Sequence, residues 1–272
     1  MKPLPFPTVA AAGDSITEDN WHELSRHTVA RIALGRVGSS LPTRETLRFA
    51  LAHAQARDAV HTPLDAQTLA ATLLAAGHQV IHVHSAASSR AEYLQRPDRG
   101  RRLHPVSRTA LLAAAGAPCD VLFVIGDGLS SRAVASHAAA LIAAICPLLQ
   151  AQQLSIGPVV IASEARVALG DEIGECLQAT LVVMLIGERP GLSSPDSMGI
   201  YLTSAPRVGR MDSERNCISN VRPEGLPYPL AAYKLNWLIR AARQQGSGVA
   251  LKDGSAAEPG WQALQQQLAS AG

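Results

Sequence analysis

The chain has 272 residues, of which 47% are hydrophobic and 17% charged, so its composition is that of a globular protein with a sizeable core. The formal net charge of +2 is too small to indicate binding to nucleic acid or to an anionic membrane. The four cysteines form no CxxC pair, so their spacing indicates neither a zinc motif nor a disulfide framework. No apolar segment typical of a secretory signal follows Met1, and we expect reduced, mostly buried thiols in a cytosolic protein.

The first part of the chain is predicted to be an arm followed by helices. Prolines alternate in its first residues and are incompatible with regular structure, so we expect residues 1–20 to be disordered or to lie on a partner. Thr43 is a candidate N-cap of a first helix. Thr62 is a candidate N-cap of a second helix, which Gly77 is predicted to end.

From residue 79 onward, predicted strands and helices alternate, a pattern typical of an α/β fold. Residues 181–186 form an unbroken apolar run, which predicts a strand buried on both faces, as in a parallel sheet. Further strands are predicted over residues 79–85, 120–125 and 158–163, an antiparallel strand over 199–204, a buried or amphipathic helix over 133–149, a last helix over 229–245 and a polar tail over 246–272.

Three histidines, His78, His82 and His84, lie on one side of the first predicted strand. A metal site is one interpretation of this pattern, and a polar face at a sheet edge or an interface is the other. We favour the polar face, because no further cluster of ligands follows nearby.

The segment GDGLSSRAV at residues 126–134 predicts a tight turn from a strand into a helix. The free N–H groups of a helix N-terminus can bind an anion or a polar group. However, the segment lacks the third glycine of GxGxxG and the lysine of a P-loop, and it is not a GxSxG elbow. It therefore gives little support to dinucleotide binding.

Three other segments allow two interpretations each. The arginine-rich residues 88–108 form either a solvated connection or a docking segment for a protein. The long polar loop predicted over 207–225 is either functional or disordered. Glu188 directly follows the apolar strand, where ligands bind in open α/β sheets, and is either a turn residue paired with Arg189 or a hydrogen-bond acceptor for a ligand.

Five segments taken together resemble the small (light) subunit of ethanolamine ammonia-lyase, in matching order over residues 25–250. They are HSAASSRAEYLQRPDRGRRL at 84–103, GDGLSSRAV at 126–134, RVALGDEIG at 166–174, IGERPGLSSPDSMG at 186–199 and NCISN at 216–220. A match in five segments is far more specific than any single short motif.

The resemblance implies a Rossmann-like α/β domain over residues 63–272, which contacts cobalamin, after an N-terminal arm and helical segment over 1–62. It implies a carbon–nitrogen lyase that converts ethanolamine to acetaldehyde and ammonia by a radical mechanism. Adenosylcobalamin would bind between this chain and a larger catalytic subunit. That subunit would also bind ethanolamine, so this chain would supply no catalytic residue and no metal ligand.

The family's cofactor contacts fall on Val167 in RVALGDEIG, Glu188 in IGERPGL and Cys217 in NCISN. Glu188 can accept hydrogen bonds from the amide rim of the corrin, and Val167 can offer a small apolar contact. Cys217 is either a polarizable contact or a plain buried thiol. The chain contains no DxHxxG motif, so the benzimidazole of a bound cobalamin is expected to stay on the cobalt.

Two alternatives belong to other classes of protein. A stand-alone Rossmann-type nucleotide-dependent enzyme would need the glycine fingerprint that GDGLSS lacks. A non-catalytic assembly protein would use the arm and the arginine-rich segment only to recruit a partner. If the chain is the lyase subunit, we expect it to be located in the cytoplasm, with a bacterial microcompartment as a more specific option.

Overall fold

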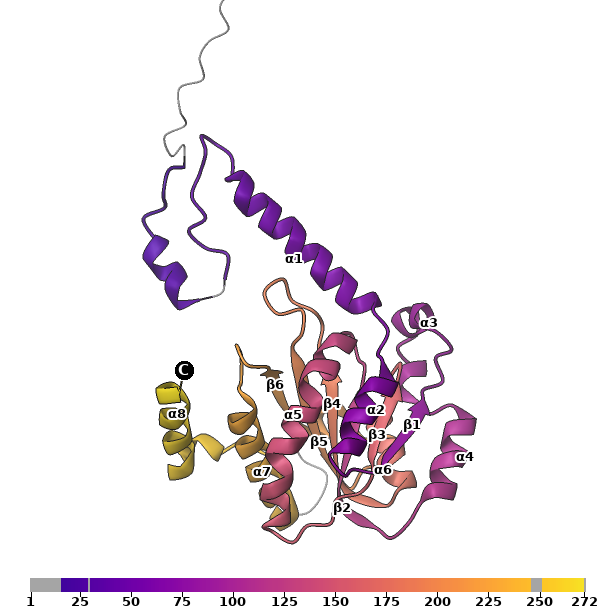
Figure 1. Ribbon diagram of the computed structural model, residues 1–272. Coiled ribbons are helices and arrows are strands. Elements are labelled where there is room, and N and C mark those ends of the chain that lie inside the picture. The colour runs from indigo at the N-terminus through magenta and orange to yellow at the C-terminus, as the bar shows by residue number, and fades with distance from the viewer. Residues whose placement is uncertain (1–15, 29, 246–250, 272) are drawn as a thin grey trace, which may run out of the picture. The chain divides into compact units, whose positions relative to one another are not determined.

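A computed structural model describes residues 16–28, 30–245 and 251–271 (Figure 1). The chain divides into two compact units, with the division between Ala56 and Arg57. The predicted arm lies outside the described residues up to residue 15.

The first unit contains a short 3-10 helix, η1 (His22–His27), and most of helix α1 (Thr43–His61). Helix α1 begins at Thr43, one residue earlier than its prediction as the N-cap implied. An isolated antiparallel bridge joins Thr17 to Arg36, with N···O distances of 2.8 and 2.9 Å.

The second unit is built on a six-stranded sheet with the order β1-β3-β2-β4-β5-β6. The strands are β1 (Val80–His84), β2 (Cys119–Gly126), β3 (Val159–Ser163), β4 (Ala179–Gly187), β5 (Met198–Ser204) and β6 (Arg215–Val221). Strands β1, β3, β2 and β4 are parallel, whereas β5 and β6 each run antiparallel to the preceding strand.

The sheet is therefore mixed: the predicted parallel arrangement holds for β1, β3, β2 and β4 but not for the last two strands, of which only the first was predicted to be antiparallel. The reason is the length of the connections, because a parallel return needs a crossover of about a dozen residues or more, usually with a helix. Residues 188–197 and 205–214 are too short for that. The antiparallel pairing predicted for residues 199–204 is confirmed. The loop predicted over 207–225 contains instead the edge strand β6.

Helices cover both faces of the sheet, each over its own hydrophobic core (Figure 1). One face carries α2 (Ala66–Ala75), α5 (Ser131–Gln150) and α7 (Tyr228–Gln245), and the other carries α4 (Pro105–Ala114) and α6 (Leu169–Cys176). The remaining helical segments are α3 (Arg90–Gln95), η2 (Arg99–Arg101), η3 (Asp212–Glu214), η4 (Ser255–Ala257) and α8 (Pro259–Ala271).

Strand β4 contributes to both cores, which confirms the strand predicted to be buried on two faces. The side chains of alternate residues point to opposite sides of a strand. Leu181, Val183 and Leu185 lie in the core under α5, and Val182, Met184 and Ile186 lie in the core under α6.

Two expectations about helices are corrected. Helix α2 is capped by Asp65, whose carboxylate accepts from the backbone N–H of Thr68 at 3.0 Å, while the Thr62 hydroxyl donates to the carbonyl of Asp58 at the end of α1. The polar tail contains helix α8, in which proline takes the first position and apolar residues recur at helical spacing. Gly77 follows α2 with a φ of 87°, as its predicted role requires.

Helix α5 is a buried helix of the core, as predicted. Among the described residues it is the helix whose length and composition would allow it to cross a membrane, but half of its apolar window is buried. Its residues Leu141, Ile142 and Ile145 are fully inaccessible to solvent. The apolar composition of α5 is thus explained by packing between the sheet and α7.

Candidate functional site

Two of the predicted contacts, Glu188 and Cys217, lie near the face of β5 and β6 on the α6 side of the sheet. Tyr201 of β5 lies opposite Cys217 of β6 and packs at the margin of the core under α6. The helices that pack on these two strands, α5 and α7, belong to the other face. We call this face the shelf; it is formed by Glu188, Tyr201, Cys217 and Ser219.

Glu188 lies at the carboxyl end of β4 and is held by two neighbouring segments. Its backbone N–H donates to the carbonyl of Ser197 at 3.0 Å, and the Ser197 hydroxyl donates to its carboxylate. The backbone N–H of Asn220 donates to Oε2 at 3.3 Å. A Cβ atom on Gly199 would lie 3.0 Å from Oε1, so glycine leaves room for the carboxylate there. The position of Glu188 is therefore fixed by the fold.

Tyr201 links the two predicted contacts Glu188 and Cys217. Burial, followed by the neighbouring Cys217 thiol and then the Glu188 carboxylate, raises the pKa of Tyr201 above its usual range. Its phenol is thus protonated at neutral pH and can donate a hydrogen bond. The sequence analysis missed Tyr201, although the alternation of GIYLTS placed it on the opposite side of the strand from the apolar residues Ile200 and Leu202.

Cys217 is exposed, so the interpretation of this residue as a plain buried thiol is wrong. Its Sγ atom lies 3.4 Å from the Ser219 hydroxyl oxygen, which is on the same face two residues later. The other three cysteines are buried, as expected. A small sulfur and a small hydroxyl leave the surface of β6 without bulky side chains.

Val167 comes from the connection between β3 and α6 and is half-buried against the same core as Tyr201. Its carbonyl accepts from the N–H of Gly170 in the first turn of α6 at 3.1 Å. A Cβ atom on Gly170 or Gly174 would lie 3.2 or 2.4 Å from the side chain of Val182, so these glycines allow α6 to approach β4 closely. The structure thus places Val167 on the same side of the sheet as the shelf.

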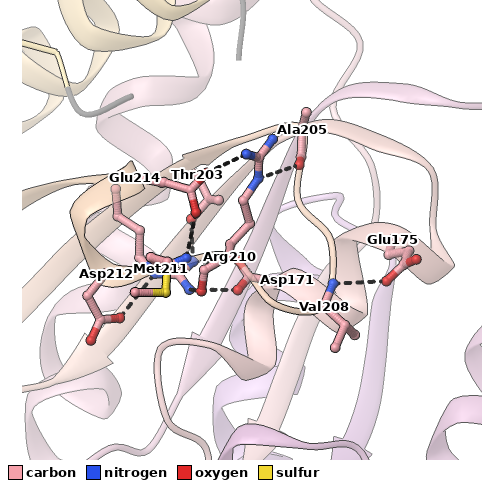
Figure 2. A network of polar contacts seen from close by, with 10 residues as sticks. Asp171, Glu175, Thr203, Ala205, Val208, Arg210, Met211, Asp212 and Glu214 are labelled. Atoms are coloured by element: carbon pink, nitrogen blue, oxygen red, sulfur yellow. Dashed lines mark hydrogen bonds and ion pairs between the residues drawn. The ribbon is translucent and has the colours of Figure 1, made fainter. Parts of the chain in front are cut away.

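A buried ion pair joins the two segments that carry Val167 and Cys217 (Figure 2). Asp171 in α6 accepts from both terminal nitrogens of Arg215 in β6, at 2.5 and 2.7 Å. The Thr203 hydroxyl accepts from the same guanidinium at 3.0 Å. The bidentate geometry sets the separation of α6 and β6 on the same face of the sheet as the shelf. Sequence reasoning missed this pair, because its partners are far apart in the chain.

The GDGLSS turn supports the end of β4, and two N–H groups of the segment 126–134 already have partners within the chain. The N–H of Leu129 donates to the carbonyl of Gly187 at 2.9 Å, and a Cβ atom on Gly128 would lie only 2.2 Å from that oxygen. The Ser130 hydroxyl accepts from the N–H of Ala133 and so caps α5. The binding of an anion or a polar group at this turn stays a prediction.

A second polar cluster lies at the carboxyl ends of β2 and β3. Asp127 accepts from the N–H groups of Glu164 and Ala165, each at 2.9 Å, and burial raises its pKa to about 6. Arg90 donates to Asp127 at 3.4 Å and to Glu164 at 3.1 Å. Within the arginine-rich segment, Arg90 thus has a structural role.

No metal site emerges from the histidines. They lie on or next to the edge strand β1, where His82 and His84 are exposed. Within the described ranges, no group of three or more histidine, cysteine or acidic residues is placed to hold a metal ion. A cleft of ≈ 500 Å³ lies away from the shelf, at the amino ends of β2 and β4, and its lining includes Asp120 and Arg243.

These features define a class: an α/β protein with a mixed sheet, whose antiparallel end presents a wide face edged by a carboxylate, a phenol and a thiol. Such a face suits a large flat ligand or a protein partner better than a small substrate enclosed by one chain.

The chain belongs to the family of the ethanolamine ammonia-lyase light chain, which it matches over residues 18–252. It is 56% identical over 243 residues to the ethanolamine ammonia-lyase small subunit of Ralstonia nicotianae, covering 88% of this chain and 90% of the relative. The small subunit from Xanthomonas campestris pv. campestris is 54% identical over 239 residues, covering 86% and 88%. That from Azotobacter vinelandii is 53% identical over 241 residues, covering 87% and 89%. The resemblance seen in the sequence is confirmed.

Proposed function

We propose that this chain is the small subunit of an adenosylcobalamin-dependent ethanolamine ammonia-lyase and that its shelf contacts the cofactor. The complex would convert ethanolamine to acetaldehyde and ammonia, with the substrate held by the large subunit. Family membership does not favour either alternative class. The observation that carries the proposal is the shelf itself, where Glu188 and Cys217 lie next to Tyr201 on the face of β5 and β6 opposite α5 and α7.

The residues of the shelf fit a corrin, which is a large flat ring with an amide rim. Glu188 can accept hydrogen bonds from amide N–H groups, and the protonated Tyr201 can donate one to an amide carbonyl. Val167 can cover an apolar part of the ring, while Cys217 and Ser219 are small enough to keep the face flat. When bound, adenosylcobalamin supplies an adenosyl radical by homolysis of its cobalt–carbon bond. This chain would orient the cofactor and exclude water from it.

Three finer points belong to the same proposal. The four parallel strands with their helices would form the Rossmann-like part of a cobalamin-contacting domain over residues 63–272. Residues 1–62, the arm and helical segment, would form the other part of the chain. The complex would work in the cytoplasm, with a bacterial microcompartment as the more specific location. A stand-alone nucleotide-dependent enzyme gains no support, because the GDGLSS turn lacks the third glycine of the dinucleotide-binding fingerprint.

The test compares the chain alone with the chain co-expressed with an ethanolamine ammonia-lyase large subunit. After gel filtration in the presence of adenosylcobalamin, we expect a corrinoid absorption spectrum and ethanolamine turnover only for the complex. Turnover of ethanolamine by the isolated chain would contradict the subunit assignment. A complex that forms but retains no corrinoid would contradict the role of the shelf.

A further inference from the structure

Arg166 precedes Val167 in the connection between β3 and α6, and its side chain is held in one place. Its backbone N–H donates to the carbonyl of Gly100 at 2.8 Å. Its guanidinium carbon lies 4.3 Å from the ring centroid of Tyr93, a stacked arrangement. Tyr93 is inaccessible to solvent, and its hydroxyl donates to the carbonyl of Ala165 at 3.0 Å. The platform under the guanidinium is therefore rigid.

Gly100, in the arginine-rich segment, packs closely against the stacked side chains of Arg166 and Tyr93. A Cβ atom there would lie 2.9 Å from Cγ of Arg166 and 2.9 Å from Cδ2 of Tyr93. Both contacts are closer than real Cβ atoms approach, so a larger residue would displace the stack. The Arg166 side chain is thus held in place both at its aliphatic Cγ, by Gly100, and at its guanidinium, by Tyr93.

The charge of Arg166 is the unusual feature. The neighbouring Arg90 has carboxylate partners in Asp127 and Glu164, and its Nε donates to a backbone carbonyl at 2.7 Å. Arg166 forms no ion pair with any residue that the structure describes, and its buried Nε has no hydrogen-bond partner among them. Buried donors are normally satisfied, and a guanidinium prefers the oxygens of a carboxylate or phosphate. Arg166 is thus placed to receive an anion.

We propose that Arg166 binds the phosphodiester of the nucleotide loop of cobalamin. This inference rests on the proposed function and deepens it by assigning a residue that recognises the cofactor's charge. The rim of the corrin carries neutral amides, and the phosphodiester is the anionic group of the molecule. Arg166 is adjacent to Val167, for which we propose a contact with the same ligand. The phosphodiester would then supply the oxygens that the described chain does not.

The experiment measures the affinity of the co-expressed complex for three probes: adenosylcobalamin, adenosylcobinamide phosphate and adenosylcobinamide. The first two carry phosphate, and the third lacks both phosphate and base. For Arg166→Gln we expect an affinity at least about tenfold lower for the two phosphate-bearing probes, because charge-assisted hydrogen bonds are lost, and an unchanged affinity for adenosylcobinamide. Arg166→Lys keeps the charge but not the planar guanidinium, so its affinity for the two phosphate-bearing probes should lie between those of the parent and Arg166→Gln.

Arg243→Gln is the matched control, because it removes the same charge beside Asp120 at the opposite end of β2. It should leave all three affinities unchanged. An equal loss for all three probes in Arg166→Gln would overturn the inference, as would no loss for any. Weaker association of the two subunits without a change in probe selectivity would instead show that Arg166 pairs with a carboxylate of the partner. If the unaltered complex binds none of the probes, the proposed function itself fails.

Discussion

The Asp171 carboxylate and the Arg215 guanidinium form a bidentate pair that connects α6 to the edge strand β6. Both side chains are almost completely buried. The pair lies between two segments that we assign to the cofactor site, Val167 before α6 and Cys217 in β6. We therefore expect its loss to affect both the stability of the fold and the shape of the shelf.

Replacing Asp171 by alanine leaves the Arg215 charge buried without its main partner. Breaking a buried pair in this way costs about 3–5 kcal/mol of the free energy of unfolding. Chemical denaturation of the purified chain measures this cost. The control is Asp98→Ala, which breaks the solvent-exposed pair with Arg96 and should change stability far less. Equal effects of the two substitutions would show that the buried pair does not determine stability.

Replacing Glu188 by alanine should weaken cofactor binding to the complex by at least about tenfold, if Glu188 accepts hydrogen bonds from the ligand. The structure adds a second expectation. The donors Ser197 and Asn220 lose their acceptor, so stability should fall by about 1–3 kcal/mol as well.

Glu188→Gln separates these two effects, because it keeps a carbonyl acceptor but loses the charge. It should lower cofactor affinity less than alanine does and preserve most of the stability. The exposed Glu224, replaced by alanine, is the control for charge alone. Titration of adenosylcobalamin followed by its absorption spectrum measures affinity. If Glu188→Ala binds the cofactor as tightly as the parent, Glu188 is only a turn residue.

Asp127 should make stability fall as pH rises from about 4 to about 6. Burial raises its pKa to about 6, above the value of 3.8 for an unperturbed aspartate, so in this range the folded chain binds more protons than the unfolded chain. Protonation thus stabilises the fold, by about 3 kcal/mol in full, and this stabilisation is lost as the carboxyl ionises.

Asp127→Asn removes that titration, so its stability should decline less between pH 4 and pH 6 than that of the parent. Urea denaturation at closely spaced pH values measures the difference. The comparison of slopes is independent of any constant loss caused by the altered hydrogen bonds to Glu164 and Ala165. Parallel stability curves for the parent and the variant would contradict the raised pKa.

Gly128→Ala should be more destabilising than Gly77→Ala. Both glycines have positive φ, which costs a residue with a side chain about 1–2 kcal/mol. A Cβ atom on Gly77 meets nothing within 4 Å, whereas one on Gly128 would lie 2.2 Å from the carbonyl oxygen of Gly187. The difference in unfolding free energy between the two variants therefore measures the steric contact alone. Cofactor affinity should also fall for Gly128→Ala, because the end of β4 precedes Glu188.

No histidine of this chain should ligate cobalt, because the DxHxxG motif is absent. Electron paramagnetic resonance of the complex with added cob(II)alamin and nitrogen-labelled histidine tests this expectation. The nitrogen coupling should come from the benzimidazole and should not change with the label. A label-dependent coupling would show that a protein histidine has replaced the base.

The parts of the fold that could be predicted are those with a local signal. The apolar run 181–186 predicts its own burial, because both faces of β4 must be covered. Strand β6 lacked such a signal, since its polar residues face the shelf or the sheet edge and only Ile218 and Val221 enter the core. Residues 215–221 form a strand because they pair with β5, and no local sequence pattern predicts that pairing. The same holds for Arg215 and Asp171, whose attraction exists only after folding.

The candidate site was predicted from resemblance more than from physical chemistry. Glu188 could be proposed from its place after a buried strand, but Val167 and Cys217 have no distinguishing pattern around them. Tyr201 could have been found from the alternation of β5, which places it on the opposite face of the strand from Ile200 and Leu202. Arg166 stands out only because its guanidinium has no hydrogen-bond or ion-pair partner among the described residues, and this requires coordinates.

The antiparallel return of β5 and β6 has a consequence for how the shelf is acquired during folding. Strands β4, β5 and β6 follow one another in the chain and pair with their immediate successors, whereas β1, β2 and β3 pair only after long crossovers. The entropy cost of closing a loop rises with its length, and contacts that are close in sequence form faster. The face assigned to the cofactor thus has the lowest contact order in the sheet. We expect its amide protons to gain protection from hydrogen exchange earlier in refolding than those of β1.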